Sequence, residues 1–185
     1  MEEDEGRPPV WSKREPSQFL VDNAGLLPKG GRALDVAMGT GRNAVYLASL
    51  GFEVTGVEIS EEACGLTLEA ARAAGVPIEA VCADLESWGP PAEAFDVVIN
   101  FNYLHRPLCP LLAAALKPGG VLVFETFTTE QRQFGWGPSR DDFLLLPGEL
   151  RRLFPGLETL VYREGVEEGE RGKKAAAGLV ARRPR

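Results

Sequence analysis

This sequence of 185 residues has no long apolar run and only one histidine. No apolar stretch approaches the roughly 18 residues that a membrane-spanning helix needs. The acidic start, "MEEDEGRPP", also lacks the basic and apolar regions of a secretion signal. We therefore expect a cytoplasmic protein that makes no contact with a membrane.

Cysteine is also scarce, and the three thiols of Cys64, Cys82 and Cys109 include no C-x-x-C pair. Their odd number and wide spacing argue against a disulfide framework and against a zinc site, so no metal is expected. We expect buried free thiols, which is how cysteines outside such motifs usually occur. Cys109 opens an expected helix, where a thiol could alternatively be reactive.

Basic residues are fewer than acidic residues, and the formal net charge is −7. This balance disfavours a broad surface for phosphate groups, so a nucleic-acid partner is not expected. The exception is residues 171–185, which hold six basic residues and no acid. That segment is either a local nucleic-acid patch or the solvated basic end of a last strand.

The chain does contain enough apolar residues for one core, at 44% of its length. We expect a loose N-terminal arm at residues 1–15 and a single domain at residues 16–185. Strand and helix patterns alternate along this domain, which predicts a doubly wound, mostly parallel α/β sheet. The expected strands are 32–37, 52–59, 78–83, 94–101 and 121–127, and the expected helices are 42–50, 61–74, 108–116 and 147–154.

The C-terminal part breaks this alternation. Residues 157–166 and 173–183 both have strand patterns, and only the charged, glycine-rich "EEGERG" separates them. Because no helix lies between them, we expect an antiparallel hairpin at the end of the sheet.

The stretch "ALDVAMGTGRNA" favours a nucleotide-type site. Gly39 and Gly41 let the backbone approach a ligand at the end of the first strand. With Ala44 these glycines satisfy the dinucleotide pattern G-x-G-x-x-G/A, and Glu58 is spaced to bind ribose hydroxyls. Asp35 distinguishes a dinucleotide from a cationic ligand, because its carboxylate would repel a pyrophosphate but would suit an ammonium or sulfonium group. A polar strand end that bonds nearby amides is the other interpretation of Asp35.

Five segments in order resemble the motifs of the class I S-adenosylmethionine-dependent methyltransferases. "LDVAMGTGRNAVYLA" (34–48) is similar to the glycine-rich first motif, "VTGVEIS" (54–60) to the second and "CADLES" (82–87) to the third. "FDVVINFNYLH" (95–105) and "ALKPGGVLVFETF" (115–127) resemble the fourth and fifth strand segments. The resemblance implies a seven-stranded sheet of order 3-2-1-4-5-7-6 with an antiparallel seventh strand.

The resemblance also implies which residues bind the cofactor, S-adenosyl-L-methionine. Asp84 and Leu85 are implied to meet the adenine edge and face, although Asp84 could instead be an ordinary loop acid. Ala37 replaces the first glycine of the family motif, and we do not expect this change to prevent binding. The candidate cofactor-binding residues are Asp35, Ala37, Gly39, Gly41, Arg42, Asn43, Glu58, Ile59, Asp84, Leu85 and Asn100.

Two residues after the fourth strand are candidates for catalysis, His105 and Tyr103. His105 could take a proton from an oxygen or nitrogen nucleophile, or it could simply be solvated. Asn100 and Tyr103 are expected beside the methyl group. "NFNY" has Phe101 and Asn102 where methyltransferases of DNA bases and glutamine amides have prolines, so we do not expect that class.

The long, aromatic segment 128–143 follows the fifth strand and suggests a substrate pocket. Phe134 and Trp136 either line this pocket or anchor a surface loop, and Asn102 is its third candidate. Arg42 and Asn43 either orient the methionine carboxylate of the cofactor or cap the first helix.

We therefore expect a methyltransferase that acts on a small molecule, as a monomer or homodimer. "GTGRNAVYLASLGFEVTGVEIS" resembles the small tellurite-resistance and thiopurine-type methyltransferases, which suggests a soft sulfur or chalcogen acceptor that needs no base. The alternatives are an RNA methyltransferase, on the basic tail alone, an NAD(P)-dependent oxidoreductase, and a non-enzymatic cofactor-binding module that regulates a partner.

Overall fold

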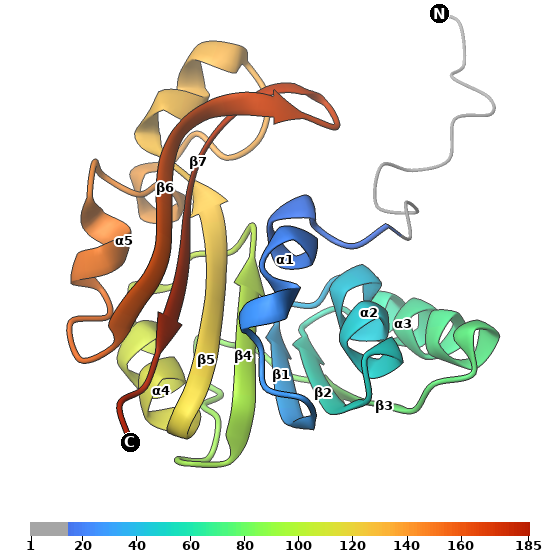
Figure 1. The fold of residues 1–185 in the computed structure, drawn as a ribbon. Coiled ribbons are helices and arrows are strands. Elements are labelled where there is room, and N and C mark those ends of the chain that lie inside the picture. Colours follow the sequence, from blue (N-terminus) through green and yellow to red (C-terminus); the bar gives the residue numbers. More distant parts are fainter. Residues whose placement is uncertain (1–14) are drawn as a thin grey trace, which may run out of the picture.

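A computed structural model describes residues 15–185 as one α/β unit (Figure 1). The expected arm at residues 1–15 lies outside the described residues, apart from Glu15. The strands are β1 (Gly31–Val36), β2 (Phe52–Glu58), β3 (Ile78–Cys82), β4 (Phe95–Phe101), β5 (Leu116–Phe127), β6 (Glu158–Gly169) and β7 (Gly172–Arg182). The α-helices are α1 (Gln18–Asp22), α2 (Arg42–Ser49), α3 (Glu61–Ala74), α4 (Cys109–Ala115) and α5 (Glu149–Arg152). The 3₁₀ turns are η2 (Ala24–Leu26), η3 (Arg106–Leu108), η4 (Thr129–Phe134) and η5 (Asp141–Phe143).

The seven strands form one sheet in the order β3-β2-β1-β4-β5-β7-β6. Strands β1 to β5 are parallel to one another, whereas β7 is antiparallel to both β5 and β6. The expected fold class, strand order and antiparallel hairpin are confirmed. This order brings the carboxyl ends of β1 and β4 together at the point where the chain reverses direction across the sheet, which is where ligands bind in such folds.

Alternating side chains of the central strands build two cores, one on each face of the sheet. Leu34 and Val98 belong to the core under α4 and α5, while their neighbours Ala33 and Val97 belong to the core under α1 and α2. All four side chains are fully buried. Continuous apolar strands covered on both faces are typical of parallel sheets, which is why these segments could be identified from the sequence.

Several elements differ from their expected bounds. β5 begins at Leu116, because "KPGG" continues the strand through an irregular register beside Phe95 instead of forming a separate turn. The expected helix at 147–154 is reduced to the four residues of α5. α1 was not expected at all, and it is fastened where the Ser17 amide donates to Asn43 Oδ1 at 2.8 Å.

The C-terminal hairpin is longer than its sequence pattern predicts. β6 and β7 pair from Glu158↔Arg182 to Gly169↔Gly172, so most of "EEGERG" is strand and only two residues turn the chain. Gly172 has a φ of 101°, a conformation that glycine adopts without steric cost. The hairpin bends over the carboxyl ends of β4 and β5 toward α1 (Figure 1). A charged segment therefore overhangs the edge of the sheet where a ligand is expected.

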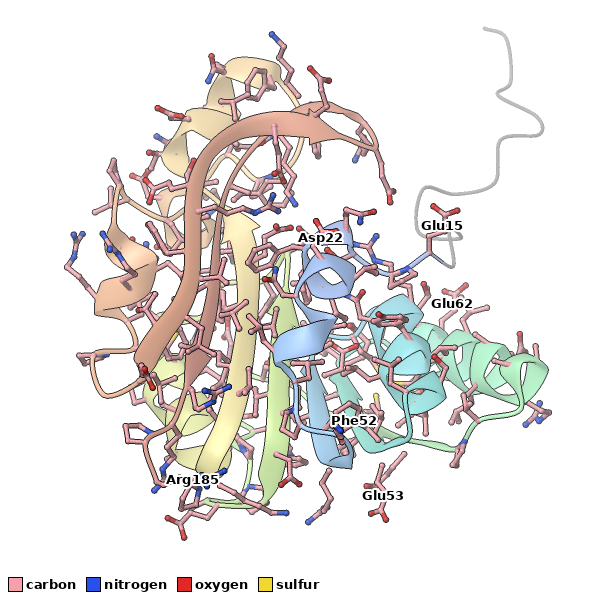
Figure 2. All side chains as sticks on the ribbon, viewed as in Figure 1. Glu15, Asp22, Phe52, Glu53, Glu62 and Arg185 are labelled. Atoms are coloured by element: carbon pink, nitrogen blue, oxygen red, sulfur yellow. The ribbon has the colours of Figure 1, made fainter. Side chains whose placement is uncertain are left out.

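The basic residues of the C-terminal segment do not gather into one patch. Lys174 pairs with Glu125 at 2.6 Å inside the fold. Arg183 pairs with Glu93 at 2.7 Å and also donates to the carbonyls of Ala114 in α4 and Leu116 at the start of β5. Arg185 lies at the opposite end of the sheet, beside Gly119 of β5 (Figure 2). The observation that suggested an RNA partner is thus weakened, since these charges are dispersed and two are neutralised.

The expected burial of the three thiols holds for two of them. Cys64 and Cys109 are buried, whereas Cys82 is exposed, because β3 is an edge strand with little covering its end. The expectation of burial was wrong for Cys82. Among residues 15–185, no helix is long and apolar enough to cross a membrane.

Candidate active site

A cavity of about 1020 Å³ opens at the carboxyl ends of the central strands, beneath the β6–β7 hairpin. The half beside β1 and β2 is lined by residues of the glycine turn and of the loops after β2 and β3. The other half is lined by β5, by the hairpin and by α1. The lining residues used below are Phe19, Asp35, Ala37, Met38, Gly39, Arg42, Asn43, Glu58, Ile59, Asp84, Leu85, Glu86, Phe101, Asn102, Tyr103, Glu125, Phe127, Trp136, Arg163, Glu167, Glu168, Glu170, Arg171 and Lys174.

The glycine turn after β1 has a fixed backbone geometry. Ala37 has a φ of 54°, in the left-handed region where the family motif has glycine and where alanine costs about 1 kcal/mol. Gly41 caps α2 with a φ of 84°. Thr67 of α3 is fully buried and its hydroxyl donates to the Gly39 carbonyl at 3.1 Å. The turn is therefore held from behind by a neighbouring helix, with Gly39 facing open space.

Asp35 is 2% exposed at the end of β1 and lines the cavity. The Ala44 amide donates a hydrogen bond to its carboxylate, while Oδ2 is buried without a hydrogen-bond partner among the described residues. Burial raises the pKa of Asp35 to about 8, against the lowering effects of Arg42 and of the Ala44 amide. Such an orphaned acceptor is costly unless a ligand satisfies it.

Glu58, at the end of β2, faces the glycine turn. Its carboxylate accepts a hydrogen bond from the Gly39 amide at 2.9 Å and another from the Ser60 amide at 3.2 Å. These bonds fix the carboxylate at the cavity wall, where each oxygen keeps a lone pair for a hydroxyl group.

The loops after β2 and β3 give the cavity an apolar slot with an acidic edge. Ile59 is 64% exposed, which is unusual for isoleucine, and Leu85 is buried beneath the loop. Asp84 is exposed, and its Oδ1 accepts a hydrogen bond from the Glu86 amide at 2.9 Å. Asp84 thus stabilises its own loop, as its alternative interpretation predicted, and also lines the cavity.

Arg42 and Asn43 both line the cavity and both have partners within the protein. Arg42 forms an ion pair of 3.4 Å with Glu170 at the hairpin tip, which connects the glycine turn to the overhanging strands. Asn43 is 4% exposed and uses Oδ1 to hold the Ser17 amide. Both interpretations of these residues are therefore compatible with their positions.

Ionic contacts in the hairpin half of the cavity were missed by the sequence analysis. Glu125 of β5 is 2% exposed and accepts from both Arg163 of β6 and Lys174 of β7. Arg163 also pairs with Glu167. The signal was present, because Glu125 is the one charged residue within the mostly apolar segment "VLVFETF". Its partners could not be named without the register of the hairpin.

Aromatic rings form the wall of the same half. Trp136 meets Phe127 edge-to-face with ring centroids 5.8 Å apart, and its indole N–H donates to the Lys173 carbonyl at 3.2 Å. Phe101 and Phe127 are nearly buried, and Asn102 adopts a φ of 58° at the cavity rim. The placement of Trp136 and Asn102 agrees with a substrate pocket.

Four of the predicted site residues do not line the cavity. Gly41 faces Thr67 behind the turn, and Asn100 is buried with its amide donating to the Tyr103 carbonyl at 2.7 Å. His105 precedes η3 and Phe134 ends η4, both half-buried outside the cavity. Gly41 and Asn100 thus support the lining residues without contacting the space between them.

Tyr103, the other candidate for catalysis, lines the cavity. Burial, followed by the negative charges of Glu86, Asp84 and Glu58, raises the pKa of Tyr103 above its ordinary value. The phenol therefore stays protonated at neutral pH and can donate a hydrogen bond, but it is a poor proton acceptor.

Residues 33–120 match the family described as a methyltransferase domain. A ribosomal protein L11 methyltransferase from Syntrophotalea carbinolica is 40% identical over 106 residues, which are 55% of this chain and 34% of that protein. The chain spans less than half the length of this and other curated relatives, among them a ubiquinone biosynthesis O-methyltransferase from Coxiella burnetii. The sequence likeness is thus concentrated in the half of the chain that forms the glycine turn and its neighbouring loops.

Solved structures extend the likeness to the whole fold. A chain from a study of the conversion of a disulfide bond into a thioacetal group in echinomycin biosynthesis is 26% identical, with a TM-score of 0.73, over 96% of this chain and 86% of that one. TehB from Haemophilus influenzae is 21% identical, with a TM-score of 0.70, over 89% of this chain and 61% of that one, and shows a shared fold. The matched segment, the strand order and these structures show that this chain has the fold of the class I S-adenosylmethionine-dependent methyltransferases and resembles them in sequence over residues 33–120.

Proposed function

We propose that this protein binds S-adenosyl-L-methionine in the half of the cavity beside β1 and β2 and transfers its methyl group to a small molecule. The buried Oδ2 of Asp35, which has no hydrogen-bond partner within residues 15–185, is the observation that carries the proposal, because such an oxygen favours a cationic or hydrogen-bond-donating ligand. Glu58 is fixed where ribose hydroxyls would bind, and Ile59 presents apolar surface to an adenine ring. When bound, the cofactor supplies an already activated methyl group, so the protein has mainly to align the acceptor.

The charge of the cavity supports the same ligand and argues against anionic acceptors. Among the described residues that line it, eight are carboxylic acids and four are basic. The excess of acids attracts a ligand with an ammonium and a sulfonium and repels phosphorylated molecules and nucleic acid. A cavity of about 1020 Å³ is at the upper end of the ~300–1,000 Å³ of ligand pockets, which leaves room for a small second ligand.

We further propose that the acceptor is a soft nucleophile of the sulfur or chalcogen type. The described lining residues include no histidine, and Tyr103 has a raised pKa, while the buried Glu125 is already engaged by two cations. A nucleophile that is ionised at neutral pH needs no proton acceptor, so it suits this wall better than an alcohol does. The likeness to TehB is compatible with such an acceptor.

Calorimetric titrations with S-adenosylmethionine and with NADH test the cofactor, and methyl transfer from the cofactor to thiols, selenite, tellurite, catechols and RNA tests the acceptor. We expect the protein to bind S-adenosylmethionine and not NADH. We also expect it to methylate a soft acceptor and not RNA. Binding of NADH alone would exclude the proposed cofactor. Turnover confined to catechols would keep the cofactor and overturn the acceptor class.

Cofactor binding should release a proton at pH 7. An acid with a pKa of about 8 is about nine-tenths protonated at this pH, and a cationic ligand beside it favours the ionised form. We therefore expect about 0.9 proton released per cofactor bound, falling to near zero above pH 9. Calorimetry in buffers of different ionisation enthalpy measures this number. Proton uptake at pH 7 would contradict the assignment of Asp35.

Replacing the single histidine should have little effect. We expect His105→Asn to keep kcat/KM within about twofold, because His105 lies outside the cavity, whereas loss of a general base costs ~100-fold or more. The measurement is the rate of methyl transfer to the best acceptor found, with thermal unfolding of the variant as a check on its fold. A loss of about 100-fold in a stably folded variant would establish His105 as the proton acceptor and reject base-free transfer.

A further inference from the structure

Two of the three thiols meet behind the end of β2, away from the cavity wall. The Cys64 thiol, in the first turn of α3, donates to the Glu58 carbonyl at 3.6 Å. The Cys82 thiol, at the end of β3, donates to the Ile59 carbonyl at 3.4 Å. The neighbouring Cys82 side chain also contributes to the raised pKa of Cys64, so the two thiols interact. The two thiols thus lie on either side of the backbone segment Glu58–Ile59, and the side chains of both residues in this segment line the cavity.

The strand register explains this meeting. Cys82 pairs with Glu58 in the parallel β2–β3 ladder, so its side chain lies at the level where β2 ends. The chain then turns through Ser60, which caps α3 by accepting from the Ala63 amide, and Cys64 returns to the same level. Cys109 lies elsewhere, in α4, and its thiol faces the His105 carbonyl.

We propose that Cys64 and Cys82 form a reversible disulfide on exposure to a peroxide, and that this bond lowers the affinity of the site for its cofactor. The second part rests on the function proposed above, and the first part does not. Cys82 is exposed and accessible to the oxidant, whereas Cys64 is buried beside it and is placed to react second. Burial and the neighbouring Cys82, Glu58 and Glu61 raise the pKa of Cys64, which agrees with this order.

The oxidation balances with hydrogen peroxide as the oxidant. The Cys82 sulfur attacks one peroxide oxygen, the O–O bond breaks, and one water leaves as a sulfenic acid forms. The Cys64 sulfur then displaces the hydroxyl group of that acid, which takes up the Cys64 proton and leaves as a second water, and the S–S bond forms. Two thiols lose two electrons, and one peroxide is reduced to two waters.

The disulfide would act on the cofactor half of the cavity through the backbone. Both thiol protons that now bond to the Glu58 and Ile59 carbonyls are lost, and the sulfurs must approach to the ~2.05 Å of an S–S bond. The segment between them carries the side chains proposed to meet ribose and adenine. We expect cofactor affinity to fall about fivefold or more, equivalent to losing one or two hydrogen bonds.

The full chain, first reduced and then treated with a small excess of hydrogen peroxide, tests both parts. We expect a mass loss of two hydrogens, a peptide in which Cys64 is linked to Cys82, and weaker calorimetric binding of S-adenosylmethionine that a dithiol reductant restores. Retention of both thiols in a labelling assay would overturn the disulfide. A complete disulfide with unchanged affinity would overturn its effect. If the reduced protein binds no cofactor, the proposed function fails, while the peptide map still decides whether the disulfide forms.

Two variants control for other oxidations. Cys82→Ser should bind the cofactor as the native protein does and should lose the peroxide response, whereas Cys109→Ser should keep the response. Met38 lines the cavity and can also be oxidised by peroxide. A loss of affinity that persists in Cys82→Ser and resists the dithiol would come from Met38 and would overturn the role of the thiol pair.

Discussion

Asp35→Asn is expected to lower the affinity for S-adenosylmethionine about 100-fold, which corresponds to ~2.7 kcal/mol and to the loss of a charged hydrogen bond in a buried site. The substitution keeps the shape of the side chain and an oxygen for the Ala44 amide, but it removes the charge that would face the cofactor's ammonium. Calorimetric titration measures the effect, and Asp22→Asn, at an exposed position that does not line the cavity, is the control.

The same variant should change the pH dependence of stability. The folded pKa of Asp35 is raised from 3.8 to about 8, so between these values the unfolded chain loses the proton and the folded chain keeps it. The free energy of unfolding of the native protein therefore falls as pH rises through this window. Asparagine does not titrate, so the variant gains stability relative to the native protein from pH 4 to pH 8. Chemical unfolding across this range measures the difference, and parallel curves would show that Asp35 is ionised in the folded state.

Gly41→Ala is expected to lower the free energy of unfolding by about 3 kcal/mol, through left-handed strain of ~1–2 kcal/mol and overpacking of ~1–3 kcal/mol. Gly41 has a φ of 84°, and a Cβ there would lie 2.5 Å from Cγ2 of Thr67. Thr67 is fully buried and hydrogen-bonded to Gly39 and Ala63, so it cannot move away freely. Chemical denaturation measures the loss, and Thr67→Ala in the same chain should recover part of it.

Gly39→Ala is the matched comparison within the same turn. Gly39 has a φ of 57°, but nothing lies within 4 Å of the position of its Cβ, so the stability cost should stay near the ~1 kcal/mol of left-handed strain. Its backbone lines the cavity, so an added methyl group should reduce cofactor affinity at least about tenfold. Equal losses of stability in the two variants would contradict the bracing role of Thr67.

The sequence determined the fold because its signals are local. Strand β4 is apolar at all positions except Asp96 and Asn100 and is largely buried on both faces. Ser60 and Gly75 cap α3 at the two ends expected from their residue types. The alternation of these elements leaves few possible sheet orders, and the motif resemblance selects the observed one. The glycine turn and its acids were also identifiable, since a cofactor site of this kind is built from residues adjacent to strand ends.

The tertiary structure alone decided the rest of the site. The approach of Arg163 and Lys174 to Glu125 depends on how β7 pairs with β5 and how β6 pairs with β7. The Arg42–Glu170 pair depends on how far the hairpin bends. His105 was placed near the chemistry by its distance along the chain, but the backbone after β4 carries it away from the cavity. The sequence determined where a ligand can bind, because strand ends and glycines act locally. Only the packing of distant strands decided what surrounds that ligand, because hydrogen bonds between strands set their register.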